Sequence, residues 1–334
     1  MSVLEIKDLN VEYRTKGTAF NKEKTVKAVN DLSLKVNQGE ILAIAGESGC
    51  GKSTLASAIC RLTPVKSGKI LFHGVDVLNL KSKKLKVYRQ ALQMIFQNPY
   101  SSLNPKMKIG DILKEPLKVN NELCIYSEDE RALYEMSKSE IDNIVKCALE
   151  TVGLDERAMN LYPHEFSGGQ RQRIAIARAL ILKPEFVIAD EPVSALDVSI
   201  QAQIINLLMQ LKSEFNLTIM FISHDMNVIR HIADRIAIMY LGKVVEIGTT
   251  EQIFKFPQHP YTRALLNAVP SFKKPKNIIL TGDIPSPTDL PDGCKFHTRC
   301  QYCMNRCKME EPELKTFYET HQVACFLNDE NIEM

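Results

Sequence analysis

The fold and the chemistry of this chain both follow from one stretch, Gly46-Glu47-Ser48-Gly49-Cys50-Gly51-Lys52-Ser53-Thr54. An apolar run at residues 41–45 precedes it and a helical apolar pattern begins at Leu55, which predicts a strand, a loop and a helix in succession. Glycines let backbone N–H groups turn toward a phosphate, and the helix start adds its positive dipole end. Lys52 brings a positive charge to the β- and γ-phosphates, and Ser53 is the expected Mg²⁺ ligand. We predict a nucleotide-binding loop; the alternative is a glycine-rich turn without a ligand.

Composition sets wide limits on the function. A chain of 334 residues with 45% hydrophobic content predicts roughly two domains with a buried core. The net charge of +2 gives no electrostatic reason to expect a nucleic-acid partner. No apolar run approaches the roughly 18 residues of a membrane span, and the N-terminus lacks the apolar centre of a signal peptide. We expect a chain without a membrane span that stays in the cytoplasm.

The segments before the phosphate loop resemble a small antiparallel sheet. Apolar and polar positions alternate in residues 3–13, and again in residues 26–29 and 32–36, which predicts short, half-exposed strands. Tyr13 ends the first of these strands. Its ring could stack on adenine or pack at the strand edge.

Polar side chains follow two further apolar runs. Residues 91–96 end at Gln97, where a polar, proline-bounded loop is typical of a switch segment. Residues 186–189 read as a buried parallel strand that ends in Asp190 and Glu191. Asp190 can hold Mg²⁺ or its water, and Glu191 can accept a proton from an attacking water. Two acids at a solvated strand end are the alternative.

Three more motifs fit a bound nucleotide. Ser167-Gly168-Gly169-Gln170 begins a predicted helix and forms a second anion-binding geometry, which we expect to serve a nucleotide held by another subunit. Ser194-Ala195-Leu196-Asp197 introduces an amphipathic helix. His224 follows the buried strand at residues 217–222, so we expect it at the sheet edge of the phosphate loop, where it can donate to a γ-phosphate.

A polar, acidic segment at residues 120–138 shows no clear period and reads as a surface insertion. The helix that follows is expected to be capped by Ser139 with Asp142 and to end at Gly153.

Composition changes near residue 255, where we place a domain boundary. Five cysteines then gather in the tail: Cys294, Cys300, Cys303, Cys307 and Cys325. In a reducing compartment such a cluster suggests a metal, although the spacing alone does not name it and free thiols are the alternative. The side chain of Cys50 is read as incidental to phosphate binding.

Taken together, these motifs resemble the ATP-binding subunit of an ABC transporter over roughly residues 4–269. The segments at 97–105, 199–203 and 259–262, with Gly293-Cys294 and Arg299-Cys300, resemble the oligopeptide/dipeptide/nickel importers, closer to the F-type than to the D-type subunit. The resemblance implies an α/β P-loop NTPase core with an antiparallel β subdomain and a helical signature subdomain at about 98–178. A nucleotide-binding domain would span residues 1–255 and a Cys-rich extension residues 256–334.

The resemblance also implies roles for the motif residues in a dimer that sandwiches ATP. Tyr13 would stack on adenine, and Gln97 would sense both the metal and the membrane partner. Glu191 would be the general base, with His224 at the γ-phosphate. The signature at Ser167 and Gly169 would complete the opposing subunit's ATP site. The implied Mg²⁺ ligands are Ser53, Gln97 and Asp190.

The implied function is ATP hydrolysis that drives import of oligopeptides or dipeptides. The implied partners are a second, D-type ATPase, two transmembrane permease subunits and an extracytoplasmic binding protein, with this chain on the cytoplasmic face of the membrane. The family pattern assigns Cys294, Cys300, Cys307 and Cys325 to a 4Fe-4S cluster; Cys303 is additional, and zinc is the alternative.

The sequence departs from the family in three places and leaves other functions open. Phe166 stands where leucine is usual and Val193 where threonine is usual; neither should abolish hydrolysis. The third departure is the insertion at residues 120–138, which the family does not explain. A nickel importer, a soluble ABC ATPase acting on nucleic acid or ribosomes, and a regulatory subunit with a dead site are the alternatives.

Overall fold

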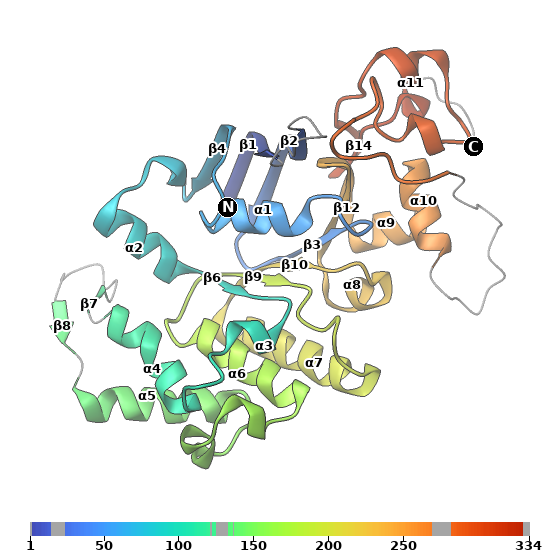
Figure 1. Ribbon diagram of the computed structural model, residues 1–334. Coiled ribbons are helices and arrows are strands. Elements are labelled where there is room, and N and C mark those ends of the chain that lie inside the picture. The colour runs from blue at the N-terminus through green and yellow to red at the C-terminus, as the bar shows by residue number, and fades with distance from the viewer. Residues whose placement is uncertain are drawn as a thin grey trace, which may run out of the picture. The chain divides into compact units, whose positions relative to one another are not determined.

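A computed structural model describes residues 2–14, 24–120, 122–124, 133–135, 137–268 and 282–329 (Figure 1). The chain divides into two compact units. Unit 1 comprises Met1–Leu78 and Phe221–Met334, and unit 2 comprises Asn79–Met220. The proposed domain boundary near residue 255 stays a prediction. Within the described ranges, no helix is long and apolar enough to cross a membrane.

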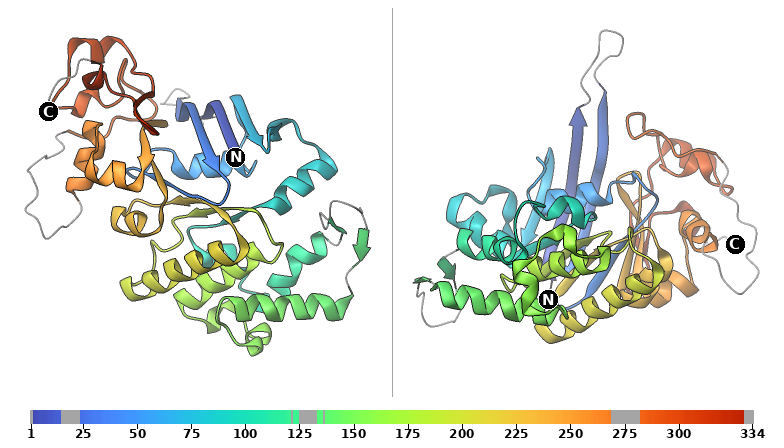
Figure 2. Two further views of the ribbon diagram at one scale, coloured as in Figure 1. Left: turned by 180° about the vertical axis from the view of Figure 1, so that it is seen from behind. Right: turned by 60° about the horizontal axis from the view of Figure 1, so that its bottom comes forward.

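Unit 1 contains the predicted antiparallel sheet, in the strand order β2-β1-β4-β5. The strands β1 (Ser2–Arg14) and β2 (Thr25–Asn37) alternate buried and exposed side chains as expected, but they are long rather than short (Figure 2). Sequence reasoning divided β2 because polar residues interrupt its alternation. The register between β1 and β2 shifts around Leu9, and Asp8 and Asp31 adopt positive φ, so both strands continue through irregularities. The remaining strands are β4 (Ser67–Phe72) and β5 (Val75–Asp76).

A second set of strands in unit 1 holds the phosphate loop. The strand β3 (Ile41–Ala45), which its apolar run predicted, is fully buried and pairs in parallel with β11 (Arg235–Tyr240). The strand β12 (Lys243–Thr249) pairs antiparallel with β11, and the tail adds β14 (His321–Val323) and β13 (Lys315–Tyr318) beyond it. The tail therefore extends this sheet. The helices of the unit are α1 (Lys52–Ile59), α8 (Met226–Ile232), α9 (Thr250–Lys255), α10 (Pro260–Asn267) and α11 (Asn305–Met309).

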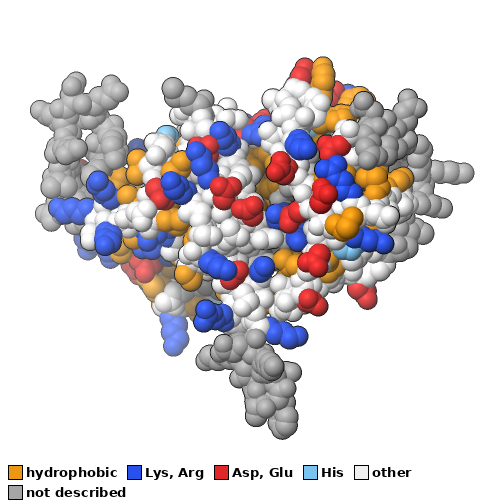
Figure 3. Space-filling view, turned by 90° about the horizontal axis from the view of Figure 1, so that it is seen from above, with side chains coloured by type: hydrophobic (Ala, Val, Ile, Leu, Met, Phe, Trp, Pro, Cys, Tyr) orange, Lys and Arg blue, Asp and Glu red, His pale blue; other side chains and the backbone are white. Residues whose placement is uncertain are grey.

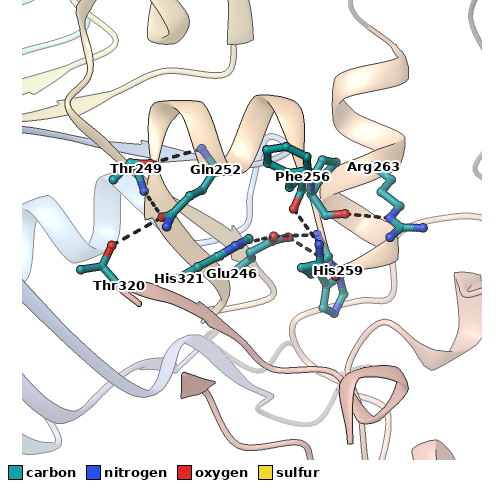
Figure 4. A network of polar contacts seen from close by, with 10 residues as sticks. Glu246, Thr249, Gln252, Phe256, His259, Arg263, Thr320 and His321 are labelled. Atoms are coloured by element: carbon teal, nitrogen blue, oxygen red, sulfur yellow. Dashed lines mark hydrogen bonds and ion pairs between the residues drawn. The ribbon is translucent and has the colours of Figure 1, made fainter. Parts of the chain in front are cut away.

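One buried carboxylate ties these late segments together (Figure 4). Glu246 on β12 is fully buried, and its oxygens accept hydrogen bonds from the backbone N–H groups of Gln258 (2.7 Å) and His259 (2.9 Å). The Nε2 atom of His321 on β14 lies 2.7 Å from the same carboxylate. A buried carboxylate is stabilised only when its oxygens are satisfied in this way. Glu246 thus fixes the start of α10 and the tail strand to β12.

His259 is expected to make the free energy of unfolding fall in mild acid. Burial lowers the pKa of its imidazole from 6.5 to about 4, and Nδ1 accepts a hydrogen bond from the N–H of Tyr261 (3.0 Å). Between these two pH values the unfolded chain binds more protons than the folded chain, so this stability is present above pH 6.5 and is lost as the pH falls toward 4. The full loss is about 3 kcal/mol. Urea unfolding at a series of pH values measures it.

The matched variant for this measurement is His259→Asn, which keeps a side-chain acceptor for Tyr261 and cannot titrate. Between about pH 4 and pH 6.5, the plot of its unfolding free energy against pH should have a smaller slope than that of the wild type. The difference should correspond to about one bound proton. Equal slopes for the two proteins would contradict the account of His259.

Unit 2 contains a parallel strand pair and the helical region. The strands β6 (Leu92–Ile95) and β9 (Phe186–Asp190) pair in parallel from Leu92 opposite Phe186 to Ile95 opposite Ala189. The strand β10 (Thr218–Ile222) begins next to them, where the N–H of Thr218 donates to the carbonyl of Glu185. The helices are α2 (Ser82–Ala91), α3 (Pro99–Ser102), α4 (Ile109–Val119), α5 (Lys138–Thr151), α6 (Gly168–Leu180) and α7 (Val198–Phe215).

Two expectations about unit 2 are corrected or refined. The helix α5 is capped by Ser137, not Ser139, because Glu140 three residues on completes a capping box with it. In the insertion, β7 (Glu122–Cys124) and β8 (Leu133–Glu135) form an antiparallel pair, which the sequence did not predict. Residues 121, 125–132 and 136 lie outside the described residues.

Candidate active site

The phosphate loop joins β3 to α1 in unit 1, as predicted. Gly51 is the residue before the first helical turn and has φ +105°, in the left-handed region that favours glycine. The N–H of Cys50 donates to the carbonyl of Glu47 (3.3 Å), and the N–H of Leu55 donates to the carbonyl of Gly51 (2.9 Å). These bonds fold the backbone into a compact turn at a helix start, the geometry that suits an anion.

Lys52 lies against the loop it belongs to. Its side chain is buried, and Nζ donates to the carbonyls of Gly46 (2.8 Å) and Glu47 (2.9 Å). The Sγ atom of Cys50 is 3.7 Å from the same ammonium. Burial raises the pKa of the Cys50 thiol, which keeps it neutral beside Lys52. The ammonium is therefore held at the inner side of the loop.

His224 lies at the predicted sheet edge. The N–H of Ser223 donates to the carbonyl of Ile44 on β3 (3.3 Å), two residues before the phosphate loop starts. His224 follows, with an exposed side chain, and Asp225 then caps α8 through the N–H of Asn227 (2.8 Å). Tyr13 at the end of β1 is also exposed, and its hydroxyl lies 3.3 Å from that of Thr63.

In unit 2 the switch glutamine and the candidate base contact each other. The parallel register of β6 and β9 places the residues after the two strands side by side. Gln97 Nε2 donates to Glu191 Oε2 at 2.9 Å, while Asp190, the last residue of β9, is buried. The structure thus brings together two of the residues that the sequence singled out, from positions far apart in the chain.

The backbone at Glu191 has an uncommon conformation. Its φ is +45°, a region that non-glycine residues rarely adopt, and its carbonyl accepts hydrogen bonds from the N–H (3.3 Å) and Oγ (3.1 Å) of Ser194. Gln201 Nε2 donates to the carbonyls of Val193 (3.1 Å) and Leu196 (2.9 Å). These bonds hold the loop at residues 194–197, and they fix the direction in which the Glu191 side chain leaves the strand.

The signature residues begin α6 in the predicted way. Ser167 is the capping residue: its Oγ accepts from the N–H of Gln170 (3.3 Å), and Gln170 Oε1 accepts from the N–H of Ser167 (3.0 Å). A Cβ atom on Gly169 would lie 2.5 Å from Cγ2 of Ile200 on α7. Close packing against α7 is a second reason for glycine here, which the anion-binding pattern did not reveal.

The five tail cysteines are near one another but do not form a ready metal site. The pKa values of Cys294 and Cys325 are raised to about 12 and that of Cys300 to about 11, first by burial and then by the other thiols of the cluster. Within the part of the chain that the structure describes, no group of three or more His, Cys, Asp or Glu side chains could hold a metal ion as placed. The metal site that the sequence led us to expect is therefore not found among the described residues.

Two contacts to the phosphate loop were missed by sequence reasoning. The Tyr261 hydroxyl on α10 accepts a hydrogen bond from the N–H of Glu47 (2.8 Å), and Arg299 donates to both carboxylate oxygens of Glu47 at 2.7 and 3.2 Å. Both residues lie in segments that carry the family resemblance. Nothing else in the sequence indicated that they contact the phosphate loop.

Comparisons with known proteins show the family of this chain. Residues 29–194 match the family described as ABC transporter, and residues 245–307 match the C-terminal region of oligopeptide/dipeptide transporters. The oligopeptide transport ATP-binding protein AppF of Bacillus subtilis is 46% identical over 333 residues, which cover 98% of this chain and 97% of the relative. The dipeptide transport ATP-binding protein DppF of Escherichia coli is 46% identical over 332 residues, 98% of this chain and 95% of the relative.

Solved structures confirm the predicted fold class. A dimeric ATP-binding cassette in a post-hydrolysis state, bound to ADP and Pi, matches with a TM-score of 0.62 and 28% identity. The match covers 74% of this chain and 98% of that chain.

Proposed function

This chain belongs to the ATP-binding subunits of oligopeptide and dipeptide ABC transporters, and on that premise we propose that it hydrolyses ATP to energise import of peptides. The observation that carries the proposal is the hydrogen bond between Gln97 and Glu191 at the ends of two parallel strands. This bond joins Gln97, the proposed switch residue, to Glu191, the proposed general base. The same chain also has the phosphate loop around Lys52.

The proposed roles come from the family resemblance, and the local geometry of several of the residues supports them. Lys52 neutralises the phosphates, and the amides of the phosphate loop bind their oxygens. Glu191 accepts the proton of the attacking water, while Gln97 holds the carboxylate in place until then. His224 donates to the γ-phosphate, and Tyr13 presents its exposed ring to adenine. The signature residues Ser167, Gly168, Gly169 and Gln170 serve the nucleotide of a second ATPase subunit.

Magnesium suits the residues proposed to hold it. Ser53, exposed on the first turn of α1, carries a hydroxyl. Asp190 carries a carboxylate at the end of β9, and Gln97, which follows β6, carries an amide oxygen. Hydroxyl and carboxylate oxygens are the ligands that Mg²⁺ prefers. When bound with ATP, Mg²⁺ neutralises the charge that develops on the phosphates.

We propose that Cys294, Cys300, Cys307 and Cys325 hold a 4Fe-4S cluster. Cysteine sulfur is the ligand type that this cluster requires, but as placed the described side chains form no group of three or more that could hold a metal, so ligation needs the tail to rearrange. The expected result is iron and acid-labile sulfide in protein purified without oxygen, with broad visible absorption.

Exchange of single cysteines tests which thiols are ligands. Cys300→Ser should lose most of the iron, because one of four thiolate ligands is removed. Cys303→Ser is the matched control, since Cys303 lies three residues away in the same turn and outside the family pattern; its iron content should equal that of the wild type. Stoichiometric zinc without iron in the wild-type protein would overturn the cluster.

The proposed partners are two permease subunits, a second ATPase of the D type and an extracytoplasmic binding protein, with this chain on the cytoplasmic face of the membrane. A nucleic-acid partner is not favoured. On the face in Figure 3, the described Lys and Arg side chains are interspersed with Asp and Glu, whereas nucleic-acid binding favours a basic stripe.

Purification of the tagged chain from native membranes in mild detergent tests the assembly. We expect mass spectrometry to identify two multi-spanning proteins and a related ATPase in the same complex. Recovery of the chain in the soluble fraction with nucleic acid or ribosomes would reject the transporter and leave the ATPase chemistry standing.

A further inference from the structure

The phosphate loop of unit 1 is held from outside by the Cys-rich tail. Glu47, the second residue of the loop, lies between the loop backbone and Arg299. The guanidinium donates from Nη1 to Oε2 at 2.7 Å and from Nη2 to Oε1 at 3.2 Å. This bidentate ion pair fixes the orientation of the Glu47 carboxylate as well as its position.

The pair is largely withdrawn from solvent. The Arg299 side chain is 6% exposed and that of Glu47 is 24% exposed. Burial of a guanidinium is unfavourable unless it is paired, so loss of Glu47 would leave an uncompensated charge, and loss of Arg299 would release the carboxylate. Surface ion pairs of the same tail, such as Arg306 with Glu310, are more exposed and contribute little to stability.

Glu47 also contacts Tyr261 and Lys52 through its backbone. Its N–H donates to the Tyr261 hydroxyl at 2.8 Å, and its carbonyl accepts from Lys52 Nζ at 2.9 Å. The side chain, the amide and the carbonyl of one residue are thus held by the tail, by α10 and by Lys52. A displacement of Arg299 therefore moves the peptide that positions the Lys52 ammonium.

The position of Arg299 depends on the packing of its own turn and on the hydrogen bond from that turn to Cys307. Arg299 ends a short turn between Cys294 and Cys300, and Phe296 in this turn is buried in an aromatic cluster. The Phe296 ring lies 5.3 Å from that of Tyr240 and 5.4 Å from that of Tyr261. Backbone bonds also join the turn to the rest of the tail, since the N–H of Cys294 donates to the carbonyl of Cys307 (2.8 Å).

We propose that Arg299 is a positioning residue of the ATP site: through Glu47 it sets the conformation of the phosphate loop and so couples ATP affinity to the Cys-rich tail. The inference rests on the proposed role of the loop in ATP binding. Arg299 does not touch the reacting atoms, so its effect falls on nucleotide binding and leaves the hydrolysis step to Glu191.

Nucleotide affinity and turnover of single variants test the proposal. In Arg299→Ala the Kd for ATP should rise about tenfold, as expected for loss of hydrogen bonds to a charged group, while kcat at saturating ATP stays within about threefold. Arg299→Lys keeps the charge but not the fork geometry, so its Kd should lie between those of the wild type and Arg299→Ala. It also carries the test if Arg299→Ala does not fold.

A double variant isolates the route through Glu47. Because Glu47 transmits the effect, adding Glu47→Ala to Arg299→Ala should raise the Kd no further than either change alone. The matched control is Arg306→Ala, which removes an arginine paired with Glu310 and Asp329 in the same tail and should leave the Kd for ATP unchanged.

Hydrogen exchange gives a readout that does not depend on activity. Coupling between two sites is reciprocal, so ATP should slow amide exchange in residues 293–307 of the wild type and of Arg306→Ala, but not of Arg299→Ala. If the wild type binds ATP and Arg299→Ala has the same Kd and the same exchange response, the inference is wrong while the proposed function stands. If the wild type does not bind ATP, the proposed function fails and the inference fails with it.

Discussion

Glu191→Gln is expected to lower the steady-state ATPase rate about 10²- to 10⁴-fold and to leave ATP binding intact. The amide that replaces the carboxylate cannot accept the proton of the attacking water. It still offers an oxygen to Gln97 Nε2, so the hydrogen bond at 2.9 Å and the local geometry can persist. The loss corresponds to about 3 to 5 kcal/mol of activation free energy.

Measurement of kcat and of the Kd for ATP on the same preparation separates these effects. Glu150→Gln makes the same chemical change at an exposed position on α5 and should leave both quantities at the wild-type values. A Glu191→Gln protein that turns over ATP at a near-normal rate would exclude Glu191 as the general base.

Gly51→Ala is expected to abolish most ATP binding and to destabilise the fold. A Cβ atom at this position would lie 2.1 Å from the carbonyl oxygen of Ala28, and the φ of +105° is unfavourable for any residue with a side chain. The backbone strain and the clash together cost about 2 to 5 kcal/mol. Relief of the clash requires Gly51 and Ala28 to move apart, which displaces the backbone expected to bind phosphate.

The matched variant is Gly49→Ala in the same loop. Its φ is +79°, but nothing lies within 4 Å of the added Cβ, so only the backbone strain of about 1 to 2 kcal/mol applies. Urea unfolding and calorimetric titration with ATP compare the two proteins. Equal losses for Gly49→Ala and Gly51→Ala would mean that the close approach to Ala28 does not shape the loop.

The sequence predicted the parts of this site that depend on local pattern. The strand, glycine loop and helix around Lys52 follow one another directly, so periodicity and glycine placement were sufficient. Gln97 and Glu191 were each placed after a buried strand. Their contact was not predicted, because it depends on the pairing of β6 with β9 across a long stretch of chain.

Long-range contacts account for most of what the sequence did not reveal. The pairing of Arg299 with Glu47 joins residues separated by 252 positions, and no local pattern distinguishes this arginine from a surface one. Glu246 interrupts an apolar strand and would be read as solvent-facing, yet it is fully buried because His321 and two backbone amides satisfy it. Such partners are supplied by tertiary structure alone.

Uptake of labelled peptides by cells that lack the gene for this chain tests the central claim most directly. We expect uptake of di- and oligopeptides to be lost, restored by the wild-type chain, and not restored by Glu191→Gln made to the same level. Labelled nickel, measured in parallel, should enter all the strains equally. Unchanged peptide uptake in the deletion strain, with or without a loss of nickel uptake, would contradict the assignment to peptide import.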